Sequence, residues 1–175
     1  MSRVISWLKT HDQRMFFLFN HKLNRNWIDF FMNRITHLGG ATMTILITIA
    51  IWLFSPERVS TVALQAFIAL AISHIPVAMM KKLYPRVRPY IKLPDVILCK
   101  RPLKDHSFPS GHTTAIFSVI CPFVVAFNWL GIILIPLAAL VGVSRMYLGL
   151  HYPSDVAAGC VIGCVTALFT VVFWV

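Results

Sequence analysis

Acidic side chains are scarce in this chain of 175 residues. Six carboxylates occur against 16 lysines and arginines, and they are scattered singly: Asp12, Asp29, Glu57, Asp95, Asp105 and Asp155. Hard cations such as Mg²⁺ bind through several carboxylate oxygens, and the sequence has no cluster of them. Chemistry that depends on a carboxylate-bound metal ion is therefore not expected, and we expect no cofactor.

The four cysteines form no C-x-x-C pair, and Cys121, Cys160 and Cys164 fall within apolar runs. Free cysteine in such a setting behaves as a small hydrophobic residue. Neither a disulfide framework nor a zinc site is expected.

The chain also has no polar stretch long enough for a separate soluble domain. Hydrophobic residues make up 58% of it, and the mean hydropathy is +0.74, which indicates a single-domain integral membrane protein. A net charge of +10 would suggest nucleic acid in a soluble protein, but here the charges border apolar stretches. Anionic lipid headgroups or a phosphorylated substrate are the expected partners, and nucleic acid is not.

Five apolar stretches approach the roughly 20 residues that a helix needs to cross a bilayer. They lie at about 38–54, 60–80, 110–130, 131–149 and 154–175, and the first is short. We predict an all-α, polytopic membrane bundle of five transmembrane helices over residues 38–175.

Residues 1–37 mix apolar and charged side chains, which favours helices that lie in the membrane interface. Val4 to Leu23 intersperses aromatic and aliphatic residues with cations such as Lys9. In the stretch from Asn26 to Leu38, Asp29 and Arg34 argue against a separate crossing. We predict an N-terminal interfacial amphipathic segment that forms one domain with the bundle, residues 1–175.

Counting these crossings places the N-terminus, the loop at 84–108 and the turn at 149–154 on one face of the cell membrane. That face carries 15 of the 16 basic side chains, and Arg58 lies on the other. The positive-inside rule would make the basic face cytoplasmic. Because several of these cations are candidate catalytic groups, the count leaves both orientations open.

The same face carries three polar clusters, of which one joins Ser144-Arg145 to His151 and Asp155. Pro153 suits the first turn of a helix, so Asp155 lies in that turn and His151 just before it. A carboxylate so placed can orient an imidazole and raise the basicity of its far nitrogen. Such a nitrogen can attack phosphorus and form a phosphohistidine. Taken alone, His151 could also be an interfacial anchor.

Pro109-Ser110-Gly111-His112 opens the third apolar stretch. Backbone N–H groups in a first helical turn lack helical partners and, with the helix dipole, form an anion site. Gly111 lets a phosphate oxygen approach the backbone closely, and His112 could protonate a leaving oxygen. An ordinary capped helix start is the alternative.

Lys81 and Arg88 are seven residues apart, about two helical turns, although Pro85 and Pro89 perturb that geometry. With Arg145 they supply two guanidinium forks and one point charge for phosphate oxygens. Three such cations could stabilise a pentavalent transition state. Alternatively, each is a cation that snorkels to the interface.

The motifs K-x6-RP, PSGH and SR-x5-H-x3-D occur complete and in this order within residues 81–89, 109–112 and 144–155. Together they resemble the signature of the type 2 phosphatidic acid phosphatase family, which shares its site with vanadium-dependent haloperoxidases. The resemblance covers about residues 81–159. It implies that His151 is the nucleophile, Asp155 its orienting partner and His112 the general acid. It assigns phosphate binding to the following residues: Lys81, Arg88, Ser110, Gly111 and Arg145.

The resemblance implies a metal-independent lipid phosphatase, as members of the family use no metal. Larger members usually have one more span, which the interfacial segment replaces here. Undecaprenyl diphosphate, converted to undecaprenyl phosphate, is our first choice of substrate because the chain is small and lacks an extramembrane domain. Phosphatidylglycerophosphate and phosphatidic acid are the alternatives.

Other function classes are less well supported by the sequence. A serine hydrolase built on Ser144 would lack the G-x-S-x-G elbow. Haloperoxidases are normally soluble, so the predicted membrane spans argue against that function. The non-enzyme alternative is a lipid-binding or transport protein that has kept the fold.

Overall fold

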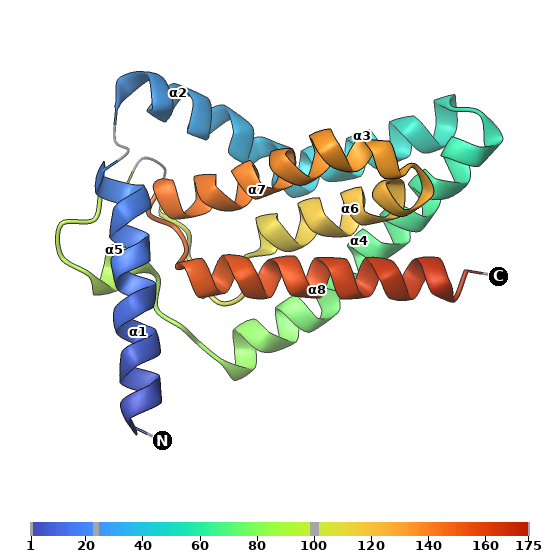
Figure 1. Cartoon of the computed structure of the whole chain (residues 1–175). Coiled ribbons are helices and arrows are strands. Elements are labelled where there is room, and N and C mark those ends of the chain that lie inside the picture. The colour runs from blue at the N-terminus through green and yellow to red at the C-terminus, as the bar shows by residue number, and fades with distance from the viewer. Residues whose placement is uncertain (1, 23–24, 99–101, 175) are drawn as a thin grey trace.

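The computed structural model describes residues 2–22, 25–98 and 102–174, and these ranges contain helices but no strands, as predicted (Figure 1). In chain order the elements are α1 (Ser2–Phe17), the π-helical turn η1 (Leu18–Lys22), α2 (Asn26–Ile35), the 3-10 turn η2 (Thr36–Gly39), α3 (Ala41–Phe54), α4 (Glu57–Leu83), α5 (Pro89–Lys92), α6 (Gly111–Ala126), the 3-10 turn η3 (Asn128–Leu130), α7 (Gly131–Tyr147) and α8 (Pro153–Val172).

Helices α3, α4, α6, α7 and α8 form the bundle and match the five apolar stretches (Figure 1). Within the described ranges, α4, the stretch Asn128–Tyr147 and α8 are long and apolar enough to cross a bilayer. Asn26–Gly39 and α3 would form a further crossing only as a pair bent by 57°, and α6 has 16 residues. The all-α membrane bundle is therefore confirmed, and five separate crossings remain a prediction.

Helix α6 lies inside the bundle and packs closely on α8 (Figure 1). The contact is close because α8 presents two glycines one turn apart, Gly159 and Gly163. A Cβ built on either would lie 2.6 Å from a backbone carbonyl oxygen of α6 or its cap, that of Ser110 or Thr114 respectively. Such small-xxx-small spacing is a common way for membrane helices to approach closely. It fixes the start of α6 against α8.

Helix α1 lies across one end of the bundle, steeply inclined to α8 (Figure 1). Phe16 is fully buried, and its ring centroid lies 5.8 Å from that of Tyr152. Asn20 donates hydrogen bonds of 2.8 Å to the carbonyls of Ile97 and Tyr147. The N-terminal segment is therefore packed on the bundle, while Trp7 is exposed. Its placement in the membrane interface stays a prediction.

The ends of α4 and α7 and the starts of α6 and α8 lie at the same end of the bundle as α1 (Figure 1). All three polar clusters belong to these helix ends or to the loops that join them. The fold thus gathers residues that are up to 74 positions apart in the sequence, from Lys81 to Asp155.

Candidate active site

A cavity of about 440 Å³ opens at this end of the bundle and collects most of the predicted site. Six of the eight predicted residues line it: Lys81, Arg88, Gly111, His112, Arg145 and His151. Ser110 and Asp155 are fully buried behind the lining residues. His74, Leu103 and Asp105, which the motifs do not include, also line the cavity.

His151 lies in the short connection between α7 and α8. Gly149 turns the chain there with a φ of +79°, a conformation that favours glycine, and Pro153 begins α8 as predicted. The imidazole is almost fully buried. Arg88 Nη1 lies 3.2 Å from Nε2 and can only donate, so Nε2 is the acceptor and the ring proton is assigned to Nδ1. The Nε2 lone pair therefore lies on the Arg88 side of the ring, where it meets the cavity.

Asp155 is near His151, but the contact is longer than a hydrogen bond. Nδ1 of His151 lies 3.7 Å from Oδ2 of Asp155. That oxygen instead accepts hydrogen bonds from the backbone N–H of Tyr152 at 2.9 Å and from Ser107 Oγ at 2.5 Å. The first of these hydrogen bonds closes a capping box at the start of α8. The same carboxylate therefore caps α8 and faces the His151 ring that it was predicted to orient.

Burial lowers the pKa of His151 from 6.5 to about 4, and the charges of Arg145 and Arg88 act in the same direction. Asp155 opposes this shift but does not cancel it. The imidazole is therefore neutral near pH 7, the state in which a histidine is a nucleophile.

The start of α6 is open toward the cavity. A Cβ built on Gly111 meets no other atom within 4 Å, so packing does not require glycine at this position. Ser110, the N-cap, makes no side-chain cap hydrogen bond, and its Oγ accepts from Thr113 Oγ1 at 2.9 Å. Backbone N–H groups of the first turn are thus available to an anion.

His112 is set by a close approach of backbone that the motifs do not reveal. A Cβ on Gly39 would lie 2.6 Å from the His112 carbonyl oxygen, and one on Gly40 would lie 3.7 Å from His112 Nε2. The turn between η2 and α3 therefore packs directly on the predicted general acid.

Lys81 and Arg88 share one carboxylate, that of Asp105. Lys81 Nζ forms an ion pair with Oδ2, and Arg88 Nη2 lies 2.8 Å from Oδ1. Burial raises the pKa of Asp105, but the hydrogen bonds and charges of Lys81 and Arg88 outweigh it and lower the pKa from 3.8 to about 2. An intrinsic anion thus occupies the place between two cations that were predicted to bind phosphate.

Arg145 is 2% exposed and donates from Nη1 to Thr36 Oγ1 of η2 at 2.8 Å. Its Nε is buried and has no hydrogen-bond partner in the described part of the chain. Buried donors are rarely left unpaired in folded proteins. Since this side chain lines the cavity, a ligand there can supply the missing acceptor.

Sequence reasoning missed Asp105, Ser107 and Arg86, although all three lie within or beside the motifs. Arg86 is two residues before Arg88 and donates to Asp155 Oδ1 at 2.7 Å. Its charge, in an apolar sequence with few acids, was the only signal that could have found it. Among the described residues, no three His, Cys, Asp or Glu side chains gather in a group that could hold a metal ion.

Comparison with known proteins identifies the family. Residues 62–175 match the PAP2 superfamily, and the chain belongs to this superfamily, which confirms the resemblance carried by the motifs. The chain is 37% identical over 126 residues to the bacitracin transport permease protein BcrC of Bacillus licheniformis, covering 70% of this chain and 60% of that protein. It is 30% identical over 121 residues to the undecaprenyl-diphosphatase BcrC of Bacillus subtilis (strain 168), covering 67% and 60%. The matches thus span about 60% of the length of these relatives.

Two solved structures share the fold. LpxE of Aquifex aeolicus superposes with a TM-score of 0.82 at 28% identity, covering 92% of this chain and 94% of that one. A transmembrane PAP2 type phosphatidylglycerolphosphate phosphatase from Bacillus subtilis gives 0.78 at 25% identity, covering 95% and 85%. With its apolar helices, the chain is a multi-pass membrane protein.

Proposed function

We propose that this chain is a metal-independent membrane phosphatase that removes a phosphate group from a lipid through a phosphohistidine on His151. The observation that carries the proposal is the single cavity that collects the neutral imidazole, three cations and an open helix start. This combination suits a phosphoryl group, since the cations and N–H groups complement its oxygens and Nε2 can reach its phosphorus.

In the first step, His151 Nε2 forms a bond to phosphorus while the bond from phosphorus to the lipid oxygen breaks. His112 gives its proton to the departing oxygen, and Asp155 stabilises the positive imidazole that results. In the second step, water gives a proton to His112 and attacks phosphorus, which releases phosphate and neutral His151. Lys81, Arg88 and Arg145 stabilise the charge of the phosphoryl oxygens throughout.

The unpaired Nε of Arg145 and the position of Asp105 support this assignment. The first is a buried donor that a phosphate oxygen would satisfy. The second is a carboxylate already held by Lys81 and Arg88, which shows that the two cations are spaced to share one anion.

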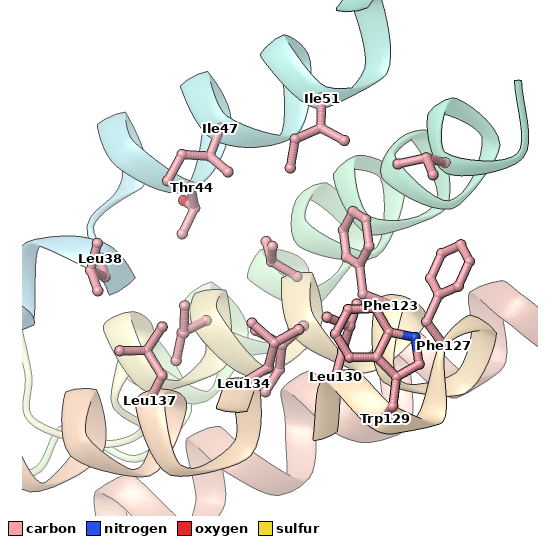
Figure 2. Close-up of a pocket in the computed structure, with 14 residues that line it drawn as sticks. Leu38, Thr44, Ile47, Ile51, Phe123, Phe127, Trp129, Leu130, Leu134 and Leu137 are labelled. Carbon is pink, nitrogen blue, oxygen red and sulfur yellow. The ribbon is translucent and has the colours of Figure 1, made fainter. Parts of the chain in front are cut away.

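A lipid substrate is supported by two apolar cavities that lie next to the catalytic one and to each other. A cavity of about 190 Å³ between α3 and α4 shares Ala41 and His74 with the catalytic cavity. It shares Thr44 with a third cavity of about 450 Å³, whose lining is almost wholly apolar. Figure 2 shows Thr44, Ile47 and Ile51 of α3 on one side of this cavity and Leu134 and Leu137 of α7 on the other. Together these cavities suit the hydrocarbon tail of a substrate whose phosphate lies at His151.

Undecaprenyl diphosphate is our first choice of substrate, with undecaprenyl phosphate as its product in the cell membrane. The Bacillus subtilis relative BcrC is an undecaprenyl-diphosphatase, and the neighbouring apolar cavities suit a long hydrocarbon tail. Phosphatidylglycerophosphate is the second choice, because the structural neighbour from Bacillus subtilis is a phosphatidylglycerolphosphate phosphatase. Phosphatidic acid is the third choice.

The test is phosphate release in detergent from a panel of these three lipids, with EDTA present. We expect release by the wild type, trapping of an acid-labile phosphoenzyme, and loss of both in His151→Asn. His11→Asn is the matched control, because His11 is exposed on α1, lies outside the catalytic cavity, and makes its hydrogen bond and ring contact with Trp7.

Each outcome bears on one part of the proposal. Loss of activity to EDTA would refute the metal-free mechanism, and full activity of His151→Asn would refute the nucleophile. Lipid binding without phosphate release from any of the three substrates would favour the non-enzyme alternative.

A further inference from the structure

Arg86 makes several polar contacts at the bundle end, although it does not line the catalytic cavity. Its Nη1 lies 2.7 Å from Asp155 Oδ1 and 2.6 Å from Ser154 Oγ, and its Nη2 lies 2.5 Å from Asp12 Oδ2. The guanidinium carbon also lies 3.9 Å from the centroid of the Tyr152 ring. One side chain thus joins helix α1 to the first turn of α8.

These contacts hold the carboxylate that faces the nucleophile. Arg86 donates a hydrogen bond to Oδ1 of Asp155, while Ser107 and the Tyr152 N–H donate to Oδ2. With donors on both oxygens, the carboxylate has little freedom to turn. Asp155 therefore stands 3.7 Å from His151 Nδ1 because other groups hold it there.

Asp12 of α1 holds Arg86 and the start of α8 together. Its Oδ2 accepts from Arg86 and from Ser154 Oγ at 2.7 Å, and its Oδ1 accepts from the Ser154 backbone N–H at 2.9 Å. The last contact satisfies one of the N–H groups that the start of α8 leaves without a helical partner. An acid on the amphipathic helix is therefore part of the support for the catalytic turn.

We propose that Arg86 is a positioning residue that holds Asp155 and limits the negative charge which Asp155 presents to His151, and that Asp12 fixes Arg86 in that place. The inference rests on the proposed phosphatase function. The guanidinium lies within about 9 Å of His151 Nδ1, given the contacts of the intervening carboxylate. At that separation one positive charge shifts the titration of an imidazole by about one pH unit.

Other charged or titratable groups also face His151, and of these only Asp155 is bonded to Arg86 in the described part of the chain. They are Arg88 before α5, Arg145 of α7 and Asp155 of α8, with Lys81 and His74 of α4, Asp105 of the following loop and His112 of α6 across the cavity. If the titration of His151 changes when Arg86 is replaced, the change therefore reflects the loss of the Arg86 charge or a shift of its partner, the Asp155 carboxylate.

The experiment compares Arg86→Met and Arg86→Lys with the wild type and with Lys82→Met. Lys82 is an exposed cation in the last turn of α4, so its replacement removes the same charge without touching Asp155. We expect Arg86→Met to raise the acid limb of the pH profile of kcat/KM by about one unit and to lower kcat between about 10- and 100-fold. Arg86→Lys should fall between it and the wild type, and Lys82→Met should match the wild type.

A charge swap separates positioning of Asp155 from docking of α1. Asp12→Arg with Arg86→Asp restores an ion pair between α1 and the loop but puts a carboxylate next to Asp155. We expect the double variant to keep its thermal midpoint better than Arg86→Asp alone and to stay inactive. Recovery of activity in the double variant would overturn the proposal, because docking of α1 would then be all that Arg86 supplies.

The titration of His151 is also measured directly by NMR with labelled histidine, which does not depend on turnover. An unchanged His151 titration in Arg86→Met overturns the inference whether or not the protein is active. Absence of phosphate release by the wild type with a shifted titration in Arg86→Met would instead overturn the proposed function alone.

Discussion

The contact between α8 and the start of α6 gives a sharp prediction for Gly159→Ala. The added Cβ would lie 2.6 Å from the carbonyl oxygen of Ser110 and 3.2 Å from side-chain atoms of Thr113 and Thr114. Ordinary contacts begin near 3.4 Å, so the two helices must separate by about 0.8 Å. Because Ser110 caps the helix whose first turn faces the proposed phosphate site, that site is displaced together with the helix.

Two magnitudes decide which measurement is informative. Overpacking of this kind costs about 1–3 kcal/mol, but alanine in place of glycine returns up to about 1 kcal/mol of helix propensity. The net loss of stability is therefore small, about 0–2 kcal/mol. Displacement of catalytic groups by about 1 Å costs on the order of 100-fold in rate. We expect kcat to fall between about 10- and 100-fold while the thermal midpoint falls by only a few degrees.

The assay is steady-state phosphate release beside thermal unfolding in the same detergent. Gly131→Ala is the matched control, since its Cβ would meet side-chain atoms at 3.4 and 3.5 Å, which is ordinary contact. Gly163→Ala should lower stability at least as much, because its Cβ would meet three atoms at 2.6 to 3.0 Å, and should lower kcat less, because this clash lies one turn further from Ser110. Wild-type kcat in Gly159→Ala would refute the argument that this glycine sets the phosphate cradle.

Three further predictions follow from the cavity. Asp105→Asn should lower the inhibition constant for inorganic phosphate about fivefold, because release of Lys81 and Arg88 from a half-exposed carboxylate is worth about 1 kcal/mol. A higher inhibition constant in this variant would mean that Asp105 instead positions the two cations. Gly111→Ala should not lower the thermal midpoint, because its Cβ meets open space, and should raise KM by about tenfold or more, because that space is where we propose that phosphate approaches. The lowered pKa of His151, about 4 against 6.5, means that the unfolded chain takes up a proton first as the pH falls. Stability should therefore fall between about pH 6.5 and 4 by an amount that is smaller in His151→Asn, as followed by thermal unfolding across that range.

The positions of the bundle helices could be predicted because apolar stretches and their proline and glycine boundaries are local properties. Pro153 and Gly111 each begin a helix where expected. The convergence of His112, Arg145 and His151 could be predicted from the motifs and from the alternation of spans, which returns the chain to one end. The bend of 57° before α3 could not, because it depends on packing of η2 against α6 and α7.

The side chains that contact the predicted site residues could not be predicted from the sequence either. Nothing local in the sequence shows that Asp12 meets Arg86 and Ser154, more than 70 positions away. The contact exists because α1 lies across the bundle end (Figure 1). Likewise, the predicted contact between His151 and Asp155 is longer than a hydrogen bond because the capping box and Ser107 occupy the same oxygen.

The scarcity of acids acquires a physical meaning at this site. Three of the six carboxylates, those of Asp12, Asp105 and Asp155, form ion pairs with Lys81, Arg86 or Arg88 at the catalytic end. Arg145 pairs with no carboxylate within 4 Å in the part of the chain that the structure describes, and it is almost fully buried. An unpaired buried charge is costly, and a well-placed anion recovers much of that cost. If a phosphate replaces Asp105 as the partner of Lys81 and Arg88, as we propose, the cavity presents three cations to a single ligand. The excess of cations over acids in the cavity therefore favours an anion of more than one negative charge, such as a terminal phosphate, over a singly charged headgroup.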